Sequence, residues 1–217
     1  MTANRGLNQF AWDLRSTPVA GATGAGQLLP SGRYTVRMTL GPTTVTQPIE
    51  IVPDPRTTST RATEALRYQL SRSLAGTVGE MNSTLQELRN VRRQAGSLSE
   101  RTKASPAAER DRAIQALITK VDSLERDLAV PPGGPSGPGS QSVLHTGSGL
   151  ISETSGLQGT IENGFGPVTE GERWEKDDYD RQWRAIKAAA DRVLTADLQR
   201  VNSLLAASGI TPVITRR

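Results

Sequence analysis

Acidic side chains are concentrated between residues 170 and 180, and they are the first candidates for chemistry. The group consists of Glu170, Glu172, Glu175, Asp177, Asp178 and Asp180. Paired carboxylates can hydrolyse glycosides or bind calcium, but the spacing lacks the regular Asp and Gly positions of a calcium loop. Acidic residues also stabilise the start of a helix, where the helix dipole is positive. We therefore expect helix initiation here, with a cation site or glycan hydrolysis as alternatives.

Other catalytic residue types are scarce. The chain has one histidine, His145, and no cysteine. A single imidazole does not form a histidine metal site, and without cysteine there are no disulfides or thiolate nucleophiles. No serine lies in a nucleophile elbow, and the glycines of residues 21–26 lack the Lys-Ser/Thr end of a phosphate loop. We expect no catalytic residue, no metal and no cofactor.

The positive charge is unevenly distributed. The net charge is +4, and residues 56–103 alone carry nine basic and four acidic residues. The basic residues include Arg89, Arg92 and Arg93, without the aromatic interleaving or the compact basic run that is typical of nucleic-acid binding. We interpret them as a solvated helix face and expect no nucleic-acid partner. Weak polyanion binding remains an alternative.

Residues 1–55 have the pattern of a β module. Alternating apolar residues predict strands over residues 9–14, 34–40 and 45–52. Pro48 favours an edge strand or a bulge, because proline has no amide hydrogen to donate. Three strands leave one apolar face open to water, and within this chain only helices could cover Trp12 and Tyr34. The predicted interface therefore consists of Phe10, Trp12, Leu14, Tyr34 and Val36.

Residues 56–217 have the pattern of an antiparallel helical bundle. Apolar residues at intervals of three and four predict long helices over 66–91, 106–128 and 179–205, with a weaker helix over 148–163. Ser105 and Pro106 are expected to begin the second helix, Gly76 and Gly79 to allow close approach of another helix, and Gly209 to end the last helix. The Pro/Gly/Ser-rich residues 131–147 are expected to form a disordered loop. The predicted fold class is α+β, and no apolar run is long enough to span a membrane.

Three segments resemble a known family: GLNQFAWDLR (6–15), PSGRYTVRMTL (30–40) and QPIEIVPDPR (47–56). They are similar to the C-terminal tail of secreted bacterial proteins with a sortilin-like β-propeller of BNR (Asp-box) repeats, often labelled glycosyl hydrolases. The residues LLAASGITPVI (204–214) resemble the end of the same tail. The resemblance implies a partial Ig-like sandwich followed by a helical bundle.

The resemblance also implies a role. The Asp-box pattern Ser-x-Asp-x-Gly-x-x-Trp does not occur in this sequence, so no catalytic position of the family is carried over. The implied function is a noncatalytic interaction module whose partner is a β-propeller domain or further Ig-like strands. Self-association is also expected, because apolar β surface would be exposed. Relatives are typically exported, which implies an extracytoplasmic location, although the first residues lack a signal-peptide pattern.

Overall fold

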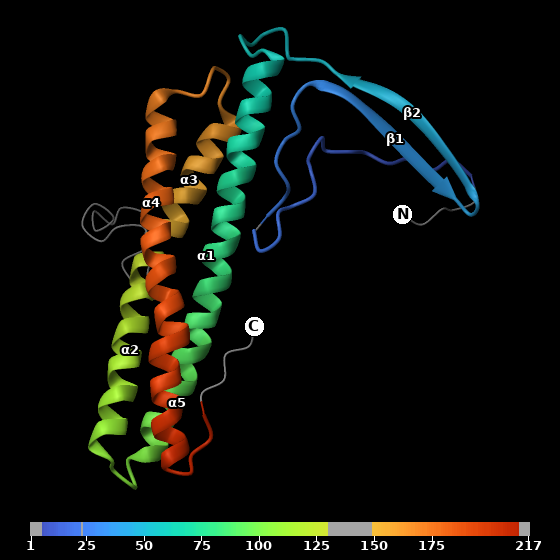
Figure 1. The fold of residues 1–217 in the computed structure, drawn as a ribbon. Coiled ribbons are helices and arrows are strands. Elements are labelled where there is room, and N and C mark those ends of the chain that lie inside the picture. Colours follow the sequence, from blue (N-terminus) through green and yellow to red (C-terminus); the bar gives the residue numbers. More distant parts are fainter. Residues whose placement is uncertain (1–5, 23, 130–148, 213–217) are drawn as a thin grey trace, which may run out of the picture.

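The chain folds into an elongated helical bundle with a β-hairpin that projects from one end (Figure 1). The computed structural model describes residues 6–22, 24–129 and 149–212. The predicted α+β class, a short antiparallel sheet followed by a helical bundle, is confirmed. The predicted loop 131–147 and His145 lie outside the described residues.

Helix α1 is the longest element and spans Arg61–Thr102. It begins with a capping box in which the Thr60 side chain accepts from the amide of Thr63 and the Thr63 hydroxyl accepts from the amide of Thr60. Its 42 residues correspond to a rod about 63 Å long. The stripe predicted over 66–91 continues through Ala95 and Leu98, so the helix extends past its predicted end.

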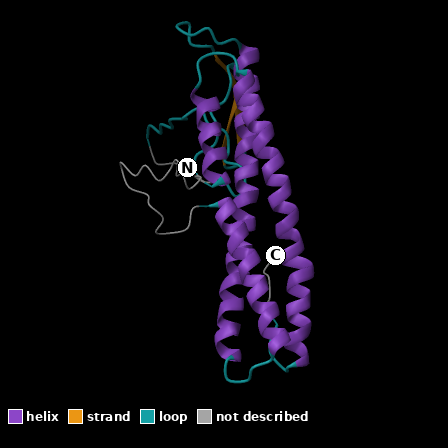
Figure 2. Cartoon of the chain, turned by 90° about the vertical axis from the view of Figure 1, so that its left-hand side faces the viewer, coloured by secondary structure: helices purple, strands orange, loops and turns teal. Residues whose placement is uncertain are grey.

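The other helices form two further rods beside α1 (Figures 1 and 2). Helix α2 (Ala108–Leu128) runs back along the far half of α1, and α3 (Leu150–Asn163) continues beside the near half. The two meet where Gly149, with φ +74°, lies against Ala129; a Cβ on this glycine would be 2.8 Å from the Ala129 Cα. The last rod is α4 (Glu170–Arg192), a π-helical turn (Val193–Asp197) and α5 (Leu198–Ala207). The bundle therefore has three rods, and the one built from α2 and α3 runs antiparallel to the other two.

The core of the bundle is aliphatic and is shared by all three rods. Trp183 of α4 is buried in this core, and its Nε1 donates to Glu80 Oε2 at 3.3 Å. Gly209 ends the last helix as predicted, with φ +68° and a bond from the Ile210 amide to the Leu205 carbonyl. The fully buried core side chains include Leu74, Met81, Leu88, Val91, Ile114, Val121, Leu128, Ile161 and Leu205.

The predicted start of the second helix is wrong by two residues. Helix α2 begins at Ala108, and its N-cap is Ala107 rather than Ser105. Ala107 has no side chain that could cap the helix. Asp111 takes over part of this task, because its Oδ2 accepts from the Ala107 amide at 3.0 Å.

The two later predicted strands form the hairpin. Strand β1 (Gly32–Leu40) pairs antiparallel with β2 (Thr43–Ile51), and Leu40 faces Thr43 across the two-residue turn Gly41-Pro42. Gly41 has φ +54°, as the first central residue of a type II′ turn requires. Pro48 lies in β2, which is an edge strand as predicted.

The strand predicted over residues 9–14 does not form. Its backbone makes no ladder; one isolated bridge joins Arg15 to Leu28, and Leu14 has φ +61°, which interrupts an extended conformation. A strand needs a ladder of hydrogen bonds to a neighbouring strand, and within the described residues the backbone of 9–14 has one such bond, from the Leu29 amide to the Leu14 carbonyl. The alternation of apolar residues was therefore insufficient to predict a strand.

Gly79 is close to a loop, not to another helix as predicted. A Cβ on Gly79 would lie 2.5 Å from the Ala20 carbonyl oxygen, and Gly21 with φ +76° contacts Gly79 in turn. The loop around residues 19–22 therefore rests directly on the backbone of α1. Gly76 lies near the same loop, where a Cβ added to this glycine would be 4.0 Å from the Val19 Cγ1.

Candidate functional site

The hairpin has one apolar face and one polar face. Cross-strand partners share a face, so Tyr34, Val36, Met38 and Leu40 lie on the same side as Val45, Ile49 and Ile51. We call these seven residues the apolar face. The opposite face consists of Arg33, Thr35, Arg37 and Thr39 with Thr44, Thr46, Pro48 and Glu50.

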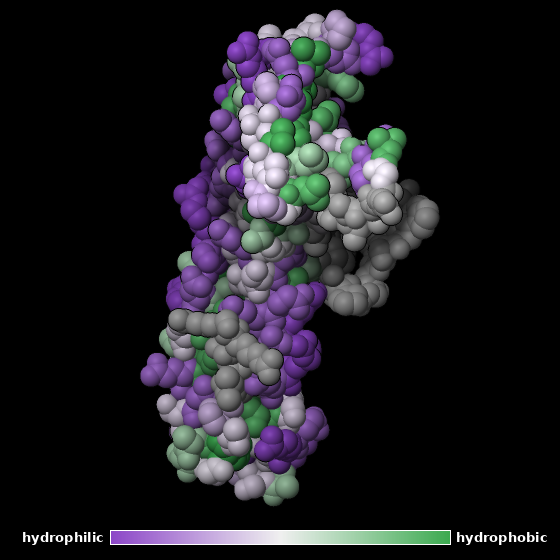
Figure 3. Space-filling view, turned by 90° about the vertical axis from the view of Figure 1, so that its right-hand side faces the viewer, coloured by the Kyte–Doolittle hydropathy of each residue, from purple (hydrophilic) through white to green (hydrophobic). Residues whose placement is uncertain are grey.

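The outer half of the apolar face is open to solvent. Val36, Met38, Leu40 and Val45 are 47%, 63%, 64% and 53% exposed, respectively. Figure 3 views the molecule from the side on which the hairpin projects. Apolar residues are visible at the surface in the upper part of this view, whereas the flanks of the bundle are mainly hydrophilic. Four neighbouring exposed apolar side chains on one strand pair are typical of an interaction surface rather than of an ordinary monomer surface.

At the inner half of the apolar face, the N-terminal segment packs on Tyr34, in addition to the helix α1 that was expected there. The rings of Trp12 and Tyr34 pack edge to face, with their centroids 6.0 Å apart. Trp12 Nε1 donates to the Arg15 carbonyl and the Tyr34 hydroxyl donates to the Pro30 carbonyl at 2.6 Å. Partial burial raises the pKa of Tyr34, and the nearby Tyr68 and Glu64 of α1 raise it further.

The five predicted interface residues therefore differ in how far they are exposed. Trp12 and Tyr34 are half-buried against each other, so they support the face from within the chain. Phe10 is 66% exposed and Val36 is also exposed, so these two are free to contact a partner. Leu14 lies at the boundary. The prediction omitted Met38, Leu40 and Val45, although the alternation of residues 34–40 already placed the first two on the face of Tyr34.

A polar joint fixes the β region onto the bundle. Glu162 of α3 binds Arg15 Nη1 at 2.5 Å and accepts from the Leu28 amide at 3.3 Å. Glu64 of α1 accepts from the Ser31 amide at 2.7 Å, immediately before β1. Arg67, which is buried in α1, donates to the Gly166 carbonyl between α3 and α4. The bonds of Glu162 and Glu64 tie the segment that precedes β1 to the bundle, and the bond of Arg67 joins α1 to the connection between α3 and α4.

A cavity of about 530 Å³ lies at this joint, but its unpaired polar atoms do not form a ligand site. Gln27 is 2% exposed and Ser31 is 9% exposed, and within the described residues neither the Gln27 Oε1 nor the Ser31 Oγ has a hydrogen-bond partner. Both atoms are buried too deeply for a water-sized group to reach them. A ligand in the cavity could not bond to them.

The acidic run initiates α4, as predicted. Glu172 completes a capping box with Thr169, whose hydroxyl accepts from the Glu172 amide at 3.2 Å. Asp180 pairs with Lys176, and Glu175 accepts from the Tyr179 hydroxyl at 2.8 Å. Burial and this bond to Glu175 raise the pKa of Tyr179. The carboxylates follow the surface of one helix, and Glu172, Glu175, Asp178 and Asp180 are each engaged by a residue within four positions.

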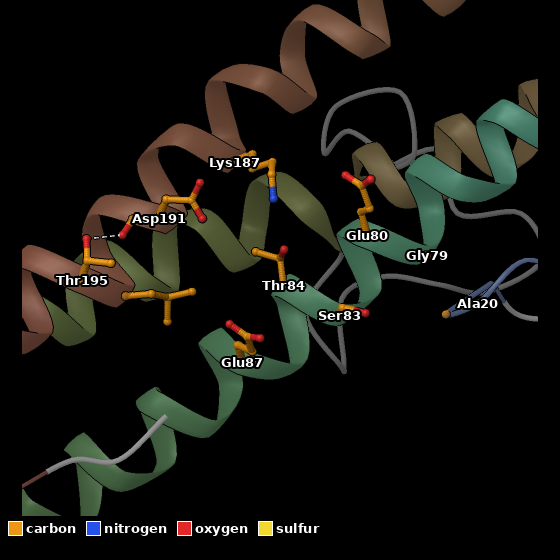
Figure 4. Close-up of a pocket in the computed structure, with 11 residues that line it drawn as sticks. Ala20, Gly79, Glu80, Ser83, Thr84, Glu87, Lys187, Asp191 and Thr195 are labelled. Carbon is orange, nitrogen blue, oxygen red and sulfur yellow. Dashed lines mark hydrogen bonds between the residues drawn. The ribbon is translucent and has the colours of Figure 1, made fainter. Parts of the chain in front are cut away.

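Further along α4, a second groove lies between α1 and α4 (Figure 4). Its volume is about 520 Å³, and Glu80 and Glu87 of α1 face Lys187 and Asp191 of α4 across it. Lys187 also lies over the ring of Trp183, at 5.7 Å from its centroid. No group of three or more metal-ligating side chains comes together within the described part of the chain.

The predicted arginine cluster lies in a groove between α1 and α2. Arg89, Arg92, Arg93 and Arg126 line it together with Asp122 and Glu125. Arg92 pairs with Asp122 and Arg93 donates to Asn90. Carboxylates among the arginines give the groove mixed charge, which favours the solvated helix face over a polyanion site.

Comparisons with protein families, with curated proteins and with solved structures found no match to this chain. None of the helices in the described ranges has the length and apolar character of a membrane span.

Proposed function

We propose that this chain is a noncatalytic accessory module that docks onto a protein partner through the outer half of the hairpin's apolar face. The observation that carries the proposal is the exposure of Val36, Met38, Leu40 and Val45 on a hairpin whose base is fixed to the bundle. The bundle buries its own apolar stripes and the hairpin does not. An apolar surface in a fixed orientation is suited to binding another surface.

The proposed partner follows from the resemblance of residues 6–15, 30–40 and 47–56 to the tail of sortilin-like, Asp-box β-propeller proteins. In this proposal the module is an Ig-like β region and a helical rod that position or cap a propeller, in an extracytoplasmic setting. The partner supplies the apolar β surface that covers the hairpin.

The test is a binding titration with a purified sortilin-like Asp-box propeller domain as the probe. Wild type is compared with a Val36→Thr, Met38→Thr, Val45→Thr variant and with a matched Thr35→Ser, Thr46→Ser control on the polar face. We expect wild type and control to bind equally and the apolar-face variant to lose at least about tenfold in affinity, since each exposed apolar group contributes on the order of 1 kcal/mol. Absence of binding by wild type, or equal binding by all three proteins, would overturn the proposal.

The enzyme alternative makes a different prediction. A glycan hydrolase that uses the acidic run would turn over an oligosaccharide and would lose this activity in a Glu172→Gln, Glu175→Gln variant. The local bonds of these two carboxylates oppose that alternative. Turnover that depends on them would contradict a noncatalytic module.

A further inference from the structure

The two edges of the hairpin are not equivalent. A two-residue turn closes on a hydrogen-bonded pair, here Leu40 and Thr43, and the pairs along the hairpin then alternate between bonded and non-bonded. Residues of the non-bonded pairs direct their amide and carbonyl groups outward. On β1 these are Arg33, Thr35, Arg37 and Thr39, and on β2 they are Thr44, Thr46, Pro48 and Glu50.

The outer edge of β2 is interrupted, whereas that of β1 is complete. Pro48 occupies an outward position and has no hydrogen to donate, so a further strand cannot pair continuously along β2. At the base of β2, Glu50 is tied to Arg61 of α1 at 2.6 Å. The outer edge of β1 has an outward donor at each of its four positions, and Thr35 to Leu40 are all exposed. An uninterrupted, exposed edge is a template for another strand.

We propose that the outer edge of β1 pairs with the same edge of a second copy of this chain, giving a two-fold symmetric, antiparallel sheet of four strands. This pairing uses the strand edge, whereas the docking function proposed above uses the apolar face, so neither depends on the other. The two apolar faces would then lie side by side in one larger sheet.

The charges of β1 restrict the registers in which a second copy can pair with this edge. A two-fold pairing centred on Thr35 would place Arg33 opposite Arg37, and one centred on Arg37 would place this arginine opposite itself. Like charges directly opposite each other destabilise a sheet. Centring on Val36 or Met38 places Arg37 opposite Thr35 or Thr39 instead. These two registers avoid directly opposed arginines and leave Arg37 only diagonal to its symmetry mate.

The difference between the edges also limits the size of the assembly. A sheet that can grow at both edges forms fibres, but here each copy offers one complete edge. Pairing of two β1 edges uses both of them and leaves the Pro48 edges outside. The expected product is a closed dimer.

Single-cysteine variants test the register, because the chain contains no cysteine. Directly opposed residues of a non-bonded pair have Cα atoms about 4.5 Å apart, within reach of a disulfide. We expect Val36→Cys or Met38→Cys to give a covalent dimer under mild oxidation. Val45→Cys is the matched control: it is exposed on the same face but lies on β2, far from its symmetry mate. Equal cross-linking of all three variants, or none by the two β1 variants, would overturn the proposal.

Proline variants test the edge. Thr39 and Thr44 face each other and their hydroxyls are 3.1 Å apart, so Thr39→Pro and Thr44→Pro lose the same side-chain bond and differ only in which outer edge loses a donor. We expect wild type and Thr44→Pro to dimerise in sedimentation equilibrium, and Thr39→Pro to be monomeric. Circular dichroism verifies that both variants are folded. A monomeric wild type, or a Thr39→Pro variant that dimerises like Thr44→Pro, would contradict pairing through β1.

Discussion

The bundle and the hairpin use apolar residues in opposite ways. In the bundle, leucine and valine stripes face one another and are buried, with Met81, Leu88 and Val91 fully inaccessible. In the hairpin, residues of the same types alternate just as regularly but Val36, Met38 and Leu40 remain exposed. A helix of this length has enough neighbours within the chain to bury its stripe, whereas two strands bury little without a second layer. The comparison indicates which region is complete and which is available to a partner.

The largest expected difference between the regions is the cost of shortening one leucine. Leu88→Ala in the bundle should lower the free energy of unfolding by about 2–5 kcal/mol, because it leaves a cavity in a packed core. Leu40→Ala, the same change on the hairpin, should lower it by less than about 0.5 kcal/mol. Urea unfolding measures both, and equal losses would mean that the hairpin face is as buried as the core.

Because the N-terminal loop rests on α1, alanine substitutions at Gly79 and Gly76 should change the free energy of unfolding in opposite directions. Gly79→Ala should cost about 1–3 kcal/mol, because its Cβ would collide with the Ala20 carbonyl. Gly76→Ala meets only the Val19 methyl at 4.0 Å and should stabilise by up to about 1 kcal/mol through helix propensity. Thermal unfolding of the two variants checks the signs. Stabilisation by both would show that the loop does not rest on α1.

The polar joint should affect the β region more than the bundle. Glu162→Ala removes the partner of Arg15 and of the Leu28 amide, which should weaken the docking of residues 15–29 by about 1–3 kcal/mol. It also removes the acceptor of the Ser71 hydroxyl of α1, at 3.4 Å. Hydrogen exchange should show lower protection at the Ser16 and Leu29 amides, which bond to Gln27 and Leu14 carbonyls. Amides in the middle of α1 should be unchanged. Loss of protection throughout α1 would mean that the joint also stabilises the bundle.

The smallest expected effect is the pH dependence at the start of α2. The bond from the Ala107 amide, assisted by Arg110, lowers the pKa of Asp111 below its ordinary value. A carboxylate whose pKa is lower in the folded state stabilises the fold above its unfolded-state pKa and loses this contribution as the pH falls through the folded-state pKa. Acidification should therefore destabilise wild type slightly more than Asp111→Asn, as measured by thermal unfolding. If the stability of wild type and of Asp111→Asn fell equally with pH, Asp111 would not contribute to the pH dependence.

The sequence predicted the helices better than the β region for a physical reason. The stripe that includes Leu74, Leu85 and Leu88 is a local pattern, and a helix satisfies its own backbone bonds. The hairpin was also predictable, since its partner strands are joined by Gly41-Pro42. The strand over 9–14 was not, because its formation depends on a neighbouring backbone that alternation does not reveal.

The candidate site was predicted in part. Alternation identified Val36 and Tyr34 as one face, but it could not reveal that Trp12 covers Tyr34 and leaves Met38 and Val45 open. The role of Gly79 was misassigned because a glycine signals close approach without identifying what approaches.

Two methionines provide the most direct test of the difference between the regions. Met38 on the apolar face is 63% exposed and Met81 in the bundle core is inaccessible. Peroxide converts an exposed thioether to its sulfoxide, while a buried one reacts only when the structure opens. Peptide mass spectrometry of the peroxide-treated chain should find Met38 oxidised at close to the rate of the unfolded chain and Met81 oxidised many times more slowly. Equal protection of the two methionines would contradict an open apolar face.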